Sequence, residues 1–138
     1  MKTEQPILIT TILAAANLDK NLFIGFDGNL CSANAKALGV SNANTNSGNQ
    51  CPVVSKGIAL VLSGAAVSVG NAVVANSSSK AIPATTFSAT VPGSGTTVTS
   101  SSAKPAMTLA GSVLPQAVNG YALDVASGAD ELIRVLLV

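Results

Sequence analysis

Residues 57–75 read GIALVLSGAAVSVGNAVVA, a stretch without charge and about as long as a membrane-spanning helix. Its small and polar residues, such as Ser63, Gly64 and Asn71, are poor lipid-facing residues. Its valines and isoleucine favour β structure. We therefore predict two short strands in this stretch rather than one helix, and this choice decides the fold class.

The same pattern continues on both sides of this stretch. Short runs of Val, Ile and Leu recur about every ten residues between clusters of Gly, Asn and Ser, whereas apolar residues at helical spacing are hard to find. We predict an all-β fold, a single-domain β-sandwich or jelly-roll-like structure with short strands and little or no helix. The expected strands lie near residues 7–14, 22–26, 37–40, 53–63, 72–75, 80–82, 108–113 and 131–137.

Two dipeptides predict tight turns. Asp27-Gly28 lies between two short apolar runs, and Asn119-Gly120 is a similar signal near the other end of the chain. An Asp-Gly or Asn-Gly pair supplies the positive φ that such turns need.

The length of 138 residues fits one domain, residues 1–138. Within it, residues 85–104 are almost all Thr, Ser, Gly, Val and Ala, which we interpret as an arm or loop. Thr and Val alternate in this segment, so an extended arm or edge hairpin ordered by a neighbouring molecule is expected. The first candidate partner contacts are therefore Thr96, Thr97, Val98 and Thr99.

Charge is scarce in this chain. Charged residues make up 9% of it, against about 25% in ordinary soluble domains. Seven basic and six acidic residues are spread singly, with no basic stripe to neutralise phosphates, so neither nucleic-acid binding nor membrane binding is expected. A net charge of +1 gives a free protein little electrostatic protection against self-association, which suits a component of an assembly.

The residues of catalytic and metal sites are missing or scattered. The chain has no His, and none of its serines lies in a Gly-x-Ser-x-Gly turn, so we predict no catalytic site, no metal site and no cofactor. Asp124 with Asp130 lacks the dense oxygen ligands of a calcium site. Cys31 and Cys51 are expected as reduced thiols, with a single disulfide left open.

The aromatic residues are too few for a base-stacking or sugar-binding platform. The chain has one tyrosine and three phenylalanines. We expect them in the core: Tyr121, Phe23, Phe26 and Phe87.

The last seven residues, LIRVLLV, are the strongest predicted strand, and they supply two more candidate contacts. Arg134 is the only arginine, and in a strand it faces the side opposite Ile133 and Val135. It is interpreted either as a rim or subunit salt bridge or as a solvent-facing residue. The strand ends at Val138, and it offers a two-fold edge-to-edge or face-to-face surface between copies or, equally, lies in the middle of the core.

Several blocks, taken in order, resemble the small capsid cement (head decoration) proteins of tailed bacteriophages. The resemblance covers about residues 7–75 and 108–138. The blocks are Asn21 to Gly28, Lys36 to Ser41, Gly57 to Val61 with Gly64 to Val67, and Asn119 to Gly128 followed by Leu132 to Val135.

The resemblance implies a β-sandwich or jelly-roll-like module on the outer surface of an icosahedral capsid, made in the host bacterial cytoplasm. Its partners would be the major capsid protein, whose neighbouring subunits it cements, and itself, with a homodimer favoured and a trimer possible. No catalytic residues carry over from the family. The family places the protein on the virion, where it would stabilise the head against the internal pressure of the DNA.

Three other readings stay open. A non-enzymatic adhesive or tail-associated β module that binds a host surface would predict aromatic or acidic ligand sites, which the sequence does not show. A bacterial surface or fibre subunit assembled by edge-strand addition shares nearly every compositional feature with a cement protein, and the order of the blocks separates the two. A small enzyme would need clustered ionisable groups in a pocket, which the absence of His and the scattered charges do not favour.

Overall fold

The computed structural model of the chain describes residues 2–85 and 116–138, and the regular elements within these ranges are all strands. No helix in the described ranges is long and apolar enough to cross a membrane. The all-β prediction is confirmed. The strands are β1 (Gln5–Leu13), β2 (Phe23–Ile24), β3 (Gly39–Ser41), β4 (Gln50–Leu62), β5 (Ala72–Ala75), β6 (Ala81–Pro83), β7 (Gly120–Ala122) and β8 (Leu132–Leu137).

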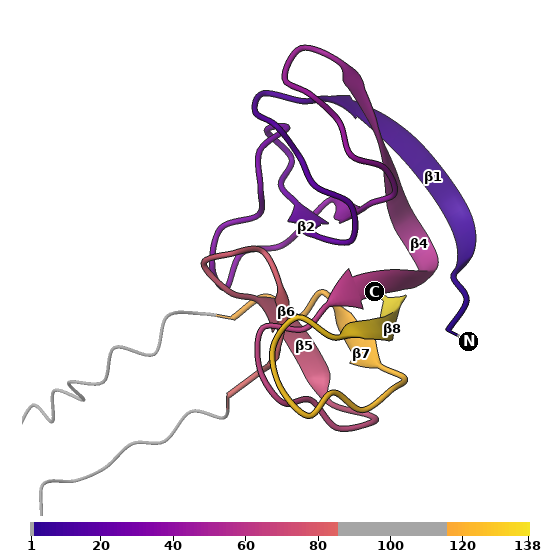
Figure 1. Ribbon diagram of the computed structural model, residues 1–138, viewed down its shortest axis with the longest axis vertical. Coiled ribbons are helices and arrows are strands. Elements are labelled where there is room, and N and C mark those ends of the chain that lie inside the picture. The colour runs from indigo at the N-terminus through magenta and orange to yellow at the C-terminus, as the bar shows by residue number, and fades with distance from the viewer. Residues whose placement is uncertain (1, 86–115) are drawn as a thin grey trace, which may run out of the picture. The chain divides into compact units, whose positions relative to one another are not determined.

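These strands form one antiparallel sheet in the order β2-β3-β4-β8-β7-β5-β6, and β1 pairs with β4 outside this path (Figure 1). The two ends of the sheet approach each other. The Phe23 amide in β2 donates to the carbonyl of Ser79, just before β6, at 2.9 Å, and Ser63 after β4 forms a bridge with Ala81. The sheet therefore closes into a barrel-like sandwich, as the sequence predicted.

The main core lies on the inner face of this closed sheet. Alternate residues point inward because neighbours along a strand face opposite sides. In β4 these are Ala59 and Val61, and in β8 they are Ile133 and Val135, all fully buried in one cluster. Most of the cluster is valine and alanine, whose small side chains allow the opposing parts of the sheet to come close together.

A second, smaller core lies on the other side of the first half of β4. It contains Ala14, Leu18, Ile24, Cys51 and Val53, with Ile12 of β1 and Leu38 packed against it. Val53 belongs to this core whereas Val54 belongs to the main one, so this half of β4 is buried on both faces.

The two cysteines are free and buried in different cores. Cys31 lies in the main core and Cys51 in the second one. The structure therefore has no bond between them, and the reduced state expected from the sequence is the one found. Burial raises the pKa of the Cys31 thiol, which disfavours its reactive thiolate form.

Most predicted strands match the structure to within a few residues. The stretch 57–75 holds the second half of β4 and all of β5, as predicted. The turn at Asp27-Gly28 is confirmed, since Gly28 has a φ of 79° and the Gly25 amide donates to the Asn29 carbonyl at 2.9 Å. The predicted strand at 108–113 lies outside the described residues.

The turn predicted at Asn119-Gly120 is wrong, because Gly120 begins strand β7, which the sequence analysis missed. A Cβ atom at Gly120 would lie 2.5 Å from the carbonyl oxygen of Leu136 in β8. Glycine here allows two strands to approach closely and does not supply a positive φ.

Asn119, directly before β7, connects three parts of the domain although it is only 2% exposed. Its side-chain nitrogen donates to the Ala35 carbonyl at 3.1 Å, and its side-chain oxygen accepts the Ala37 amide at 2.9 Å. Its own amide donates to the Val73 carbonyl in β5 at 2.8 Å. One buried amide thus satisfies backbone groups of a loop that has no strand partner there.

We predict that Asn119→Ala lowers the free energy of unfolding by about 1 to 3 kcal/mol, because it leaves buried backbone groups at Ala35 and Ala37 without partners. Denaturant titration measures this loss. The matched control is Asn46→Ala at an exposed position, where the change should stay within about 0.5 kcal/mol. Equal losses in the two variants would contradict the structural role of Asn119.

Candidate interaction surface

The face of the sheet that points away from the main core is apolar across β4, β8 and β7. Because Ala59 and Val61 point inward, their neighbours in β4 point outward, and the same alternation holds in β8. Tyr121, Leu132 and Leu136 are 44%, 39% and 43% exposed. We call this surface the outer apolar face, and it consists of Ile58, Leu60, Leu62, Tyr121, Leu132 and Leu136.

The strand register makes the outer apolar face continuous. Tyr121 lies opposite Leu136, and Leu136 lies opposite Ile58, so one apolar row crosses three strands. Leu132 lies opposite Leu62 and forms a second row. Side chains opposite each other in a ladder are in contact distance, and a contiguous exposed apolar patch marks an interaction site.

Arg134 lies within this face, opposite Leu60, and binds Asp124 in the same chain. Its Nε and Nη2 atoms donate to the two carboxylate oxygens of Asp124 at 3.0 and 2.9 Å, and its amide donates to the same carboxylate at 2.9 Å. This two-point geometry is the strong form of an arginine ion pair. The hydrogen bonds from the Arg134 side chain are the main cause that lowers the pKa of Asp124 to about 2.

The two charges therefore cancel inside the outer apolar face. The sequence analysis left Arg134 between a subunit salt bridge and a solvent-facing residue, and the structure gives it a partner in its own chain. Its remaining guanidinium N–H groups make no hydrogen bond within the described ranges. Arg134 as a contact to another molecule stays a prediction.

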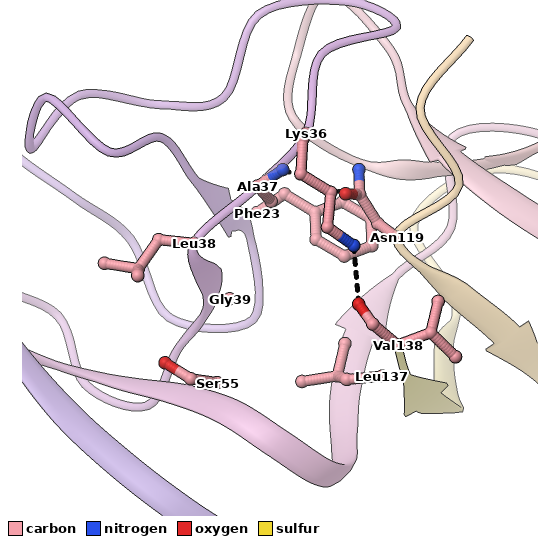
Figure 2. Close-up of a pocket in the computed structure, with 9 residues that line it drawn as sticks. All are labelled: Phe23, Lys36, Ala37, Leu38, Gly39, Ser55, Asn119, Leu137 and Val138. Atoms are coloured by element: carbon pink, nitrogen blue, oxygen red, sulfur yellow. Dashed lines mark hydrogen bonds between the residues drawn. The ribbon is translucent and has the colours of Figure 1, made fainter.

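Val138 is the other candidate contact of the last strand. Its main chain is held by a hydrogen bond, and the residue is 58% exposed. The Lys36 amino group donates to the main-chain oxygen of Val138 at 2.5 Å and to the carbonyl of Val118 at 3.0 Å. Figure 2 shows this amino group beside Asn119 at a small pocket. Lys36 has the one titratable side chain that lines the pocket. Its amine binds two main-chain oxygens, at Val118 and Val138, and so links the loop before β3 to these two segments.

The described residues bring no catalytic or metal-binding groups together. Asp124 pairs with Arg134 whereas Asp130 pairs with Lys80, so the two carboxylates do not share a site. Among residues 2–85 and 116–138 there is no group of three side chains able to hold a metal ion. The other candidate contacts, Thr96, Thr97, Val98 and Thr99, lie outside the described residues and stay a prediction.

The expectation that the aromatic residues lie in the core is wrong for two of them. Phe23 is fully buried, but Phe26 is 67% exposed and Tyr121 lies on the outer apolar face. Phe87 lies outside the described residues. The final strand has large apolar residues on both of its sides. This was the one signal in the sequence that could have revealed the outer apolar face.

The final strand is also not an edge. β8 lies between β4 and β7, so the edge-to-edge contact between copies that the sequence allowed for this strand is wrong. Strand order depends on contacts between residues far apart in the chain, which a local pattern does not contain. β8 lies in the middle of the sheet, as the sequence analysis also allowed. A face-to-face contact between copies at this strand stays a prediction.

These features define a class of small, barrel-like all-β domains with an apolar outer face. The model of a family described as phage cement protein matches residues 1–137. The chain therefore belongs to the phage cement protein family, and the resemblance seen in the sequence is confirmed.

Among the solved structures with a similar fold is one from a bacteriophage. It is the N base of the head fibre gp8.5 of bacteriophage phi29, with a TM-score of 0.61 and 16% sequence identity. The match covers 95% of this chain and 93% of that one. At this identity the similarity shows the fold alone. No curated protein matches the chain.

The lowered pKa of Asp124 predicts how stability responds to acid. The value in the folded protein is about 2, below the ordinary 3.8, so folding favours the ionised carboxylate. This contribution to stability is complete above about pH 4 and is lost as the pH falls through about 2. The lowered pKa values of Asp27 and Glu131 add to the same acid sensitivity.

We therefore expect Asp124→Asn to be less stable than the wild type at pH 7 and to lose less stability between about pH 4 and 2. Thermal unfolding at a series of pH values measures both effects. Asp19→Asn removes the same charge at an exposed position and is the control for the loss of one negative charge. The same slope in Asp124→Asn and the wild type would contradict the role of the ion pair.

Proposed function

We propose that this protein is a non-enzymatic structural component of the virion that binds the outer surface of an icosahedral phage capsid. There it cements neighbouring major capsid protein subunits and stabilises the head against the pressure of the packaged DNA. The observation that carries the proposal is the outer apolar face in a member of the phage cement protein family. The chain is made in the host bacterial cytoplasm and joins the capsid from there.

The chemistry of the outer apolar face supports a protein partner. Tyr121 and the leucines offer apolar area, and the Arg134–Asp124 pair adds hydrogen-bonding groups without adding net charge. Large aromatic and arginine side chains are the residues that dominate protein interfaces. Because the same contact repeats over a closed shell, a modest affinity per site is sufficient to reinforce it.

The alternative is a fibre- or tail-associated β module. The similarity to the base of a head fibre supports it at the level of fold. The two functions differ in what the protein covers, since a cement protein occupies its sites at a fixed ratio to the capsid subunits. A fibre module attaches elsewhere or at few places.

The direct test is co-sedimentation of the purified protein with emptied, undecorated phage heads, with the copies bound per capsid subunit quantified. Saturable binding at a fixed ratio supports cementing. No binding to such heads would overturn the proposal.

The contact surface is tested by Leu136→Lys, which places a charge in the middle of the outer apolar face. We expect head binding to weaken at least about tenfold, because the lysine must be desolvated in the interface. Val69→Lys is the matched control, since Val69 is 62% exposed and lies in the loop between β4 and β5. Its binding should equal that of the wild type.

Circular dichroism and a melting curve establish that both variants are folded. Undiminished binding by a folded Leu136→Lys would remove the outer apolar face as the capsid contact. Deletion of residues 85–104 then tests the second candidate contact, Thr96 to Thr99. The deleted protein is expected to fold and to decorate heads poorly.

A further inference from the structure

The tight turn after β2 presents an exposed aromatic side chain. Phe26 is 67% exposed, although Phe23 and Ile24 of β2 directly before it are fully buried. The chain returns at Leu30, which forms a bridge with Ile24 and is 40% exposed. We call residues 25–29 the Phe26 turn. A single exposed apolar residue is ordinary on a protein surface, and two properties distinguish this one.

The first property is that the turn is held rigidly. The Asp27 carboxylate accepts the Asn29 amide at 3.1 Å and the Asn29 side-chain nitrogen at 3.0 Å. The Gly25 amide donates to the Asn29 carbonyl at 2.9 Å. The turn is also fixed to the chain after β1, because the Ala15 amide donates to the Gly28 carbonyl at 2.9 Å. A side chain carried by such a turn loses little backbone freedom on binding.

The second property is the apolar strand end beside the turn. A Cβ atom at Gly28 would collide with the Leu13 carbonyl oxygen, so glycine allows the turn to lie against β1. Ile12 packs against the second core, and Leu13 and Ile9 therefore point to the opposite side of the strand. Both are exposed there. The turn and the strand end thus bring exposed apolar residues of two elements to one region.

This region lies apart from the outer apolar face. Leu13 is opposite Gln50, the first residue of β4, whereas the outer apolar face begins at Ile58 and ends at Leu62, the last residue of β4. The eight steps from Gln50 to Ile58 correspond to about 26 Å along the strand, at about 3.3 Å per residue. Figure 1 shows the C-terminal end of β1 at the opposite end of the domain from β7 and β8.

We propose that the Phe26 turn binds a second major capsid protein subunit, next to the subunit that the outer apolar face contacts. The inference rests on the proposed function and deepens it. Cementing requires one molecule to hold two subunits together, and two separate surfaces on one domain supply the two contacts. The phenyl ring of Phe26 enters an apolar depression on the second subunit, as large aromatic side chains do in protein interfaces.

The charge of the turn specifies the rim of this depression. Asp27 is the one charged residue in residues 21–35. Hydrogen bonds from Asn29 lower the pKa of Asp27, so the carboxylate is ionised at neutral pH. The ion pairs among the described residues do not include Asp27. A carboxylate without a cationic partner, beside an apolar anchor, is complemented by a lysine or arginine at the rim of the depression.

Photo-cross-linking on emptied, undecorated heads tests the proposal. The probe p-benzoylphenylalanine replaces Phe26 in one variant, Tyr121 in a second and both residues in a third. Each single replacement should link the chain to one capsid subunit. The double replacement should also give a product that contains one copy of the chain and two capsid subunits. The probe at Val69, which is 62% exposed in the loop between β4 and β5, is the matched control and should give no link.

Phe26→Ser tests the energetic role of the ring. We expect head binding to weaken at least about tenfold, and heads saturated with this variant to melt as undecorated heads do. Val69→Ser should bind and stabilise heads as the wild type does. Asp27→Asn keeps an oxygen that accepts the Asn29 amide, and it should make head binding less sensitive to salt. Melting curves of the free variants establish that each is folded.

The outcomes separate this inference from the proposed function. A wild type that does not bind heads contradicts both. Head binding with a capsid link from position 121 and none from position 26 overturns this inference alone. So does a link from position 26 to another copy of the chain, or a double replacement that never joins two capsid subunits. A folded Phe26→Ser variant that binds and stabilises heads as the wild type does also overturns it.

Discussion

Closure of one sheet around a small core is the constraint on which the rest of this structure depends. The hydrogen bond from Phe23 in β2 to Ser79 before β6 joins the two limits of the sheet. Valines and alanines fill the inner face. Because their side chains are small, the opposing parts of the closed sheet pack close together. Because alternate residues of each strand form this core, the residues between them point outward, where they are available to bind a partner.

Buried polar groups complete the closure where strands end. Asn119 binds the loop at Ala35 and Ala37, and the hydroxyl of Ser79 donates to the Cys31 carbonyl at 2.8 Å. The hydroxyl of Ser63 donates to the Gly128 carbonyl at 2.7 Å. Short polar side chains fit between loops that a larger residue would separate, and they satisfy backbone groups that no ladder reaches. The low charge of the chain is compatible with this use of Ser and Asn.

Closure also decides which surfaces remain for partners. The strands of the main path use both of their edges, whereas β1 pairs with β4 alone within the described ranges. The outer apolar face offers side chains around a neutral ion pair. In the proposed function, the outer apolar face is the surface that contacts the capsid.

The sequence by itself determined the fold class, the turn at Asp27-Gly28 and the family, because turn chemistry, strand periodicity and ordered blocks are local properties of the chain. Tertiary structure alone decided that Gly120 lies in a strand, that Tyr121 lies on the surface and that Arg134 binds Asp124. It also decided that β8 lies between β4 and β7 and that β1 pairs with β4 alone among the described strands. These features depend on which strands become neighbours, and long-range pairing is set by the packing of the whole sheet rather than by any segment.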